Sequence, residues 1–97
     1  MTKGTTSGGF PFTFDEMRLD DMRFVDVLAV VVDPDAAALD KTAGLSKLIE
    51  MLLGAEQKKA LYAFIGAMHE GGRVPVAELE EALREIMQGA GKDAEKN

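Results

Sequence analysis

The chain has 97 residues, of which 46% are apolar and 29% charged, and its 11 basic and 17 acidic side chains give a net charge of −6. This length and apolar content are typical of one globular domain and exclude disorder over most of the chain. The chain contains no cysteine, which excludes a disulfide framework and fits a reducing cytosol. No apolar run of about 18 residues is present, so we expect no membrane span, and the acidic charge disfavours binding to nucleic acid.

The first residues differ in composition from those that follow. Residues 1–9 are rich in Gly, Thr and Ser, and we expect a disordered N-terminal tail there. Phe10, Phe12 and Phe14 then alternate with the period of a strand. Because Pro11 cannot donate a hydrogen bond to a neighbouring strand, we expect an extended segment that packs its three rings against the core.

The next stretch is the most apolar of the chain. Asp20 or Asp21 can cap the N-terminus of a helix, which we expect to span residues 21–32. The valines of this stretch also favour a strand, so both a helix and a strand stay open for residues 24–32. As a helix, it would be apolar around nearly its whole circumference, through Phe24, Val25, Val27, Leu28, Val30, Val31 and Val32.

This apolar stretch also predicts a binding surface. A helix that is apolar on every side must be covered on every side, and a chain of this length has few other helices to cover it. We therefore expect a partner or a second copy of the chain to contact it. The candidate partner-binding residues are Phe24, Val27 and Val31.

A second helix is predicted to begin at Asp33 and Pro34, because an Asp at the cap followed by Pro at the first helical position is typical of a helix start. Gly44 either ends this helix or is a weak point within a longer one, and Gly54 ends the longer one. Its apolar positions follow helical spacing: Leu45, Leu48, Ile49, Leu52 and Leu53.

Two further helices complete the pattern. Residues 55–70 form the clearest one, and its interior Gly66 implies a packing reason, because glycine costs about 1 kcal/mol against alanine in a helix. The last helix begins at Pro75 and ends at Gly89. The polar residues 89–97 are expected to form a disordered tail.

The sequence therefore predicts an all-α fold: a small bundle of about four helices, with an extended N-terminal Phe-rich segment and flexible tails. The predicted organisation is a disordered tail over residues 1–9, one helical domain over residues 10–88, and a disordered tail over residues 89–97.

The side-chain inventory does not favour an enzyme. His69 is the one histidine, and a lone histidine without cysteine cannot make a zinc site, which needs three or four suitable ligands. No phosphate-binding loop of the GxxxxGK[ST] type occurs. We expect a non-enzymatic protein with no cofactor and no metal site.

The order of four segments resembles the tail assembly chaperones of long-tailed (siphovirus) bacteriophages, especially those of actinobacterial hosts. The closest matches are the LLGxEQ turn and the GRVP link, and the resemblance covers about residues 10–97. The segments are FTF (12–14), MRLDDM (17–22), LLGAEQKKAL (52–61) and GGRVPVAELEEAL (71–83).

The resemblance implies a helical protein that binds the tape measure protein and keeps it soluble during assembly of the tail tube. It implies a place in the cytoplasm of the infected host cell and absence from the mature virion. The expected partners are the tape measure protein and the tail tube protein, with self-association as well, and neither nucleic acid nor a membrane. The alternative is a bacterial helical adaptor or regulator that acts as a homodimer through the same apolar helix.

Overall fold

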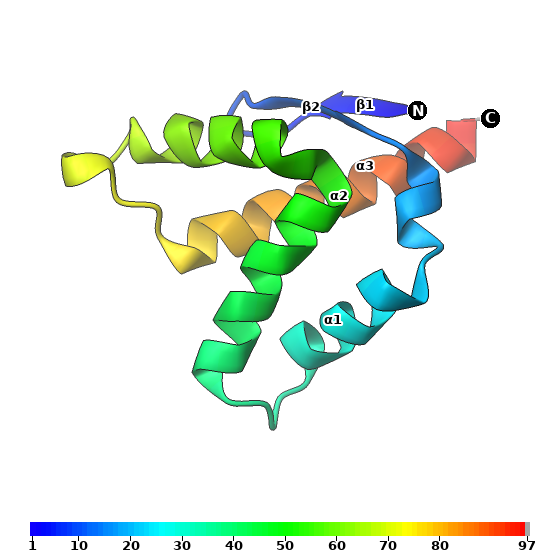
Figure 1. The fold of residues 1–97 in the computed structure, drawn as a ribbon. Coiled ribbons are helices and arrows are strands. Elements are labelled where there is room, and N and C mark those ends of the chain that lie inside the picture. The colour runs from blue at the N-terminus through cyan, green and yellow to red at the C-terminus, as the bar shows by residue number, and fades with distance from the viewer. Residues whose placement is uncertain (97) are drawn as a thin grey trace.

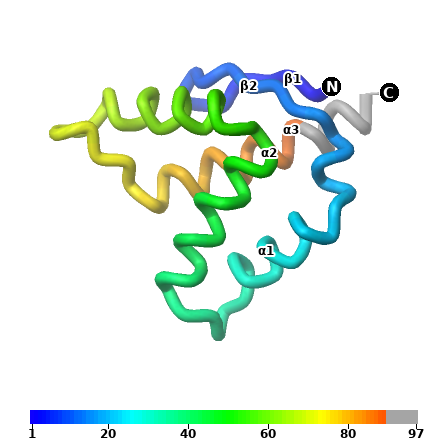
Figure 2. Tube along the Cα trace, viewed as in Figure 1, coloured from blue at the N-terminus to red at the C-terminus, as the bar shows by residue number. Residues whose placement is uncertain are grey.

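The computed structural model describes the backbone of residues 1–96 and the side chains of residues 1–89. Figure 1 shows a two-stranded hairpin lying against a helical body, and Figure 2 shows the same chain path as a trace. None of the helices in the described part of the chain has the length and the hydropathy that crossing a bilayer requires. In chain order, the elements are β1 (Thr2–Thr5), β2 (Pro11–Phe14), the 3-10 helix η1 (Glu16–Leu19), α1 (Met22–Val32), α2 (Ala38–Gly66), the 3-10 helix η2 (Glu70–Gly72) and α3 (Val76–Lys96).

The predicted all-α bundle of about four helices with flexible tails is wrong. The described residues form three α-helices and a two-stranded antiparallel sheet. The sheet arises where we expected a disordered tail, because residues 1–9 contain β1 and the turn of the hairpin. The predicted helix end at Gly89 is also wrong, because α3 continues to Lys96 where a disordered tail was expected; Asn97 lies outside the described residues.

Hydrogen bonds at its turn close the hairpin. The two strands are antiparallel, with Thr2 opposite Phe14. The Thr6 N–H donates to the Phe10 carbonyl at 2.9 Å, and Thr6 Oγ1 accepts from the Phe10 N–H at 3.1 Å. Gly9 has a φ of 103°, a conformation that glycine adopts without the steric cost of a Cβ. The glycines and the serine of this segment therefore suit a tight turn. Its threonines are good strand formers, and they belong to β1 or directly follow it.

Glu16 in η1 fixes the start of the chain. The buried Thr2 donates a hydrogen bond from Oγ1 to Glu16 at 2.7 Å, and the amino group of Met1 lies 3.2 Å from the same carboxylate. The hydrogen bond from Thr2 is the main reason that the pKa of Glu16 is lowered from its ordinary value of 4.5. Strand β1 is thus held by a charged group outside the hairpin.

The predicted packing of the three N-terminal phenylalanines on the core is confirmed, because Phe10, Phe12 and Phe14 are all buried. The Phe12 ring fills a narrow space between two glycines. A Cβ built on Gly4 would lie 2.7 Å from Phe12 Cζ, and one built on Gly89 would lie 3.2 Å from it. The other buried apolar residues come from the three helices: Phe24, Leu45, Leu48, Ile49, Leu52, Leu53, Leu61, Ile65, Leu79, Ala82, Leu83 and Ile86.

Helix α1 confirms the helical interpretation of residues 21–32, and the alternative of a strand is wrong. Asp21 is its N-cap, and its Oδ1 accepts from the Arg23 N–H at 2.9 Å. The cap and the tertiary contact with α2 outweigh the strand propensity of the valines.

The predicted helix start at Asp33 and Pro34 is wrong. Asp33 is the C-cap of α1, and α2 begins only at Ala38. The Asp33 carboxylate accepts from the Asp35 N–H at 2.8 Å, so it stabilises a turn instead of a helix N-terminus. Aspartate side chains serve both purposes, and this local competition explains the difference.

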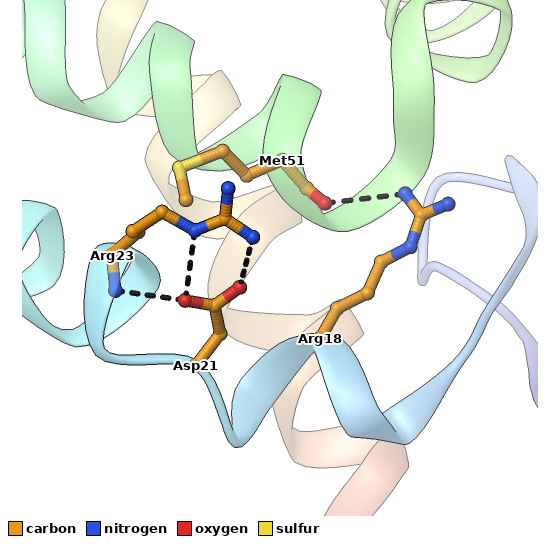
Figure 3. A network of polar contacts seen from close by, with 4 residues as sticks. All are labelled: Arg18, Asp21, Arg23 and Met51. Atoms are coloured by element: carbon orange, nitrogen blue, oxygen red, sulfur yellow. Dashed lines mark hydrogen bonds and ion pairs between the residues drawn. The ribbon is translucent and has the colours of Figure 1, made fainter.

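Helix α2 changes direction at Gly54, the residue at which the sequence predicted a helix end. Gly54 has φ 83° and ψ 165°, and Figure 1 shows the two halves of α2 meeting at a sharp angle. A helix break leaves carbonyl groups without their usual partners. Arg18 Nη1 donates to the carbonyls of Met51 and Leu52 at 3.2 and 3.3 Å, and Figure 3 shows the first of these bonds. Gly44, by contrast, stays within the first half of α2.

Candidate partner-binding groove

The structure places Phe24, Val27 and Val31 together on the face of α1 that meets α2. Phe24 is 2% exposed and belongs to the core, whereas Val27 and Val31 are half-buried. The two valines lie over Gly44, where an added Cβ would be 2.8 Å from Val31 Cγ2 and 3.5 Å from Val27 Cγ1. The role of the three residues in partner binding stays a prediction, and Val31 is the one that also borders an open groove.

That groove lies between α1, the first half of α2, and α3, and its volume is about 680 Å³. This is within the range of about 300–1,000 Å³ that is typical of ligand-binding clefts. Leu45 and Leu83 form its apolar floor, and both are almost fully buried. The remaining lining residues are Leu28, Val31, Val32, Lys41, Glu80, Arg84, Met87 and Gln88.

Sequence reasoning missed the α3 side of this groove. The spacing of Leu83 and Met87 marks the inner face of the last helix, and both residues contribute to the core or pack against it. The opening beside them depends on how α1 and α3 diverge from the first half of α2, which no local pattern encodes. The sequence signal that did point here is the surplus of apolar residues on α1.

Helix α1 also carries an apolar stripe on its solvent side, and this stripe leads into the groove at Val32. Met22 and Val32 are each 67% exposed, and Val25 is 41% exposed. With the exposed Ala29, they repeat every three or four residues, which places them on one side of the helix. We name Met22, Val25, Ala29 and Val32 the outer stripe. An apolar surface of this kind, bordered by polar residues, is typical of an interaction site.

Three aspartates lie next to residues of the outer stripe in the sequence. Asp26 follows Val25 on α1, while Asp33 and Asp35 follow Val32 in the next loop, and all three are exposed. Arg23, the one base on α1, is held elsewhere: its Nε and Nη2 donate to Asp21 at 3.1 and 2.7 Å (Figure 3).

The contact between Asp21 and Arg23 favours the charged form of both side chains. The hydrogen bond from the Arg23 side chain lowers the pKa of Asp21, and the same bond raises the pKa of Arg23. Arg23 therefore does not neutralise the aspartates beside the outer stripe.

A second pocket is a weaker candidate. It lies between the hairpin turn, the second half of α2, and α3, and its volume is about 160 Å³. Its three glutamates already have partners within the chain. Glu78 lies 2.5 Å from His69 Nε2, Glu81 pairs with Arg84, and Glu85 accepts from the Ser7 N–H at 2.9 Å. The larger groove is thus the candidate site.

Comparisons of this chain with family models, with curated proteins and with solved structures found no match. Among the described residues, no group of three or more His, Asp or Glu side chains is arranged to hold a metal ion. The groove and the outer stripe are therefore the features on which a proposal for function can be based.

Proposed function

We propose that this chain is a non-enzymatic tail assembly chaperone of a long-tailed bacteriophage, which binds an amphipathic helix of the tape measure protein. The observation that carries the proposal is the apolar groove between α1 and α3, which continues into the outer stripe. Amphipathic helices bind to other proteins by laying their apolar face into such grooves. The resemblance in sequence supplies the identity of the partner.

The proposed action is to cover apolar surface on the partner. Full burial of a Val or Met side chain stabilises a complex by about 1.5–3 kcal/mol before the costs of association are deducted. A few such side chains in each copy give weak binding, which suits a chaperone whose client is later enclosed by another protein. Many copies along one long client increase the overall avidity without making any single contact permanent.

In this proposal the chain acts in the cytoplasm of the infected cell and is absent from the mature virion. The tape measure protein is the main partner, and the tail tube protein meets the same complex when it assembles around the client. Self-association of the chaperone is a further part of the proposal.

The test is co-expression with the tape measure protein encoded in the same genome, with the soluble client as readout. The double variant Met22→Ser/Val32→Ser removes two exposed apolar side chains from the outer stripe. The control Met68→Ser/Val76→Ser removes the same two residue types from exposed positions outside the groove. We expect the first variant to lose most of the soluble client and the control to keep it. Equal behaviour of the two variants would contradict the proposal.

A homodimeric adaptor is the second candidate, and the outer stripe favours it. Positions 22, 25, 29 and 32 have the spacing with which two helices pair along their length. Sedimentation of the purified chain separates the candidates. A stable dimer that Met22→Ser/Val32→Ser converts to a monomer, together with no effect on the tape measure protein, supports the adaptor.

A further inference from the structure

The residues beside the outer stripe are mostly acidic. On the α1 side, neither Asp26 nor Asp35 has a hydrogen-bonded or ion-paired side-chain partner within residues 1–89. The third acid there, Asp33, bonds only to a backbone N–H. No base offsets these three, because Arg23 is occupied by Asp21. None of the three lines the groove; they lie beside residues of the outer stripe, so this edge of the outer stripe is acidic.

The residues that line the groove itself carry charges of both signs. On α3, Glu80 and Arg84 both line the groove, and Arg84 is paired with Glu81. Glu80, one turn before Arg84 on the helix, has no ion pair among the described residues. Lys41, at the start of α2, is the other base among the lining residues. The groove lining thus holds two bases and one acid, and the acidic excess of this surface lies beside the outer stripe.

We propose that the groove and the outer stripe take an amphipathic helix whose apolar side is bordered by Lys or Arg where it faces α1. This rests on the proposed function and adds to it the chemistry of the bound segment. Basic residues beside the stripe would reach Asp26, Asp33 and Asp35, while the apolar residues cover Val32, Leu83 and Met87.

A second copy of the chain fits this surface less well. Its exposed apolar stripe lies on its own α1, which carries Asp26 and leads into Asp33 and Asp35. Pairing two such helices would place acids next to acids, and like charges at a contact favour a different partner. A basic helix meets no such penalty.

The geometry also limits the length of the occupant. The groove follows α3 from Glu80 to Gln88, which corresponds to about 12 Å along a helix axis. Apolar residues at i, i+3 or i+4, and i+7 of the occupant span that length. The outer stripe, from Met22 to Val32, extends the contact to about three helical turns.

Two designed peptides test the proposal without requiring the natural partner. Both have about 18 residues, long enough to form a helix, and the same leucine and alanine stripe. One carries Lys beside the stripe and the other carries Glu. Fluorescence anisotropy with the full chain is measured at about 50 mM and about 300 mM salt, because screening weakens ionic contacts. Backbone NMR shifts locate the bound peptide on the chain.

We expect the Lys peptide to bind about tenfold more tightly than the Glu peptide at low salt, with a smaller ratio at high salt. The variant Asp26→Asn/Asp35→Asn should weaken binding of the Lys peptide about 2- to 25-fold, since each of two exposed ion pairs changes affinity by about 1.5- to 5-fold. The control Glu56→Gln/Glu70→Gln makes the same change of charge at exposed positions outside the groove and should leave affinity within about twofold.

Three results would overturn the proposal: equal or tighter binding of the Glu peptide, equal loss in the variant and the control, or NMR shifts outside both the groove and the outer stripe. Failure of the proposed function has a different signature: in the co-expression test, Met22→Ser/Val32→Ser and the control Met68→Ser/Val76→Ser keep equal amounts of soluble tape measure protein, whatever the peptides do. Other results concern the charge preference alone. If both peptides bind equally and Met22→Ser/Val32→Ser abolishes both, the groove takes helices and only the charge preference is wrong. If neither peptide binds but the tape measure protein is kept soluble, the charge preference is again wrong and the proposed function stands.

Discussion

The side-chain amide of Gln57 pairs with both backbone groups of Thr13. The Thr13 N–H donates to Gln57 Oε1 at 3.0 Å, and Gln57 Nε2 donates to the Thr13 carbonyl at 2.6 Å. The same Nε2 donates to the Leu53 carbonyl at 2.9 Å, next to the break of α2 at Gly54. One side chain therefore takes the place of a neighbouring strand along β2 and joins the hairpin to the break in the helix. It also covers a strand edge that could otherwise pair with another chain.

Replacing this amide should loosen the hairpin. Gln57→Glu keeps the size of the side chain but removes both N–H donors and places a carboxylate beside two carbonyl oxygens. We expect a loss of about 1–3 kcal/mol in the free energy of unfolding, because partly buried carbonyls are left unsatisfied. Urea unfolding measures the loss, and hydrogen exchange at the Thr13 amide locates it. The control Gln88→Glu changes an exposed glutamine and should have little effect; equal losses in the two variants would disprove the role of Gln57.

Gly66 should not tolerate even a methyl group. A Cβ at this position would lie 2.7 Å from the carbonyl oxygen of Gly72, a backbone atom that cannot rotate away. Alanine gains about 1 kcal/mol of helix propensity, but overpacking against a fixed backbone costs about 1–3 kcal/mol, so Gly66→Ala should destabilise the fold. Thermal unfolding measures the result. A higher melting temperature would show that the turn into η2 moves freely.

Local signals in the sequence predicted part of this fold. The cap at Asp21, the extent of α1 and the turn of α2 at Gly54 depend on residues that are neighbours in the chain. The hairpin could not be predicted in the same way. Thr2 pairs with Phe14, and Gln57 supports that pairing from a distance of 44 residues, so a segment with the composition of a disordered tail is ordered by distant contacts.

The candidate site, too, could be predicted from the sequence only in part. The apolar surplus of α1 correctly marked the helix that borders the groove, but not the side chains that remain accessible. Phe24 is the largest apolar side chain there, and it points into the core, whereas Met22 and Val32 face solvent. Helical spacing alone cannot identify the outward side of a helix that is apolar all round.

Acid should release the start of the chain from η1. The pKa of Glu16 lies below its ordinary value of 4.5, because the folded state favours the ionised carboxylate that accepts from Thr2. The stability from this group is fully present above the unfolded pKa and is lost as the pH falls through the folded pKa. We expect the amides of β1 to be less protected against hydrogen exchange, relative to the unfolded chain at the same pH, below about pH 4.5. NMR measures this protection. In Glu16→Gln this acid step should be absent, and a step of the same size would contradict the assignment.

Phe24 should contribute mainly to the stability of the fold and not to partner binding. Because its ring is buried in the core, Phe24→Ala should cost about 3–5 kcal/mol, a large share of the roughly 5–15 kcal/mol that holds a domain folded. Urea unfolding should show a much lower midpoint, whereas Met22→Ser at an exposed site should leave the midpoint nearly unchanged. If Phe24→Ala kept its midpoint and lost only the partner, Phe24 would be a binding residue, as the sequence suggested.

A substitution at Gly44 should destabilise the fold, and a second substitution at Val31 should restore part of the lost stability. An alanine Cβ at Gly44 would lie 2.8 Å from Val31 Cγ2, and valine is stiff about its first side-chain torsion, so the methyl group cannot turn aside easily. Gly44→Ala should therefore push α1 away from α2 and destabilise the fold by about 1–3 kcal/mol, less the gain of helix propensity. Val31→Ala removes the clashing methyl group but also loses buried apolar surface.

The double variant Gly44→Ala/Val31→Ala should consequently be more stable than the sum of the two single changes implies. We expect a favourable coupling of about 0.5–3 kcal/mol, the range seen for residues in direct contact, from a double-mutant cycle of urea unfolding. Because Val31 also lines the groove, the Lys peptide described above should bind Gly44→Ala more weakly and recover in part in the double variant. Additive free energies would show that Val31 and Gly44 are not in contact, and the width of the groove would then not depend on this glycine.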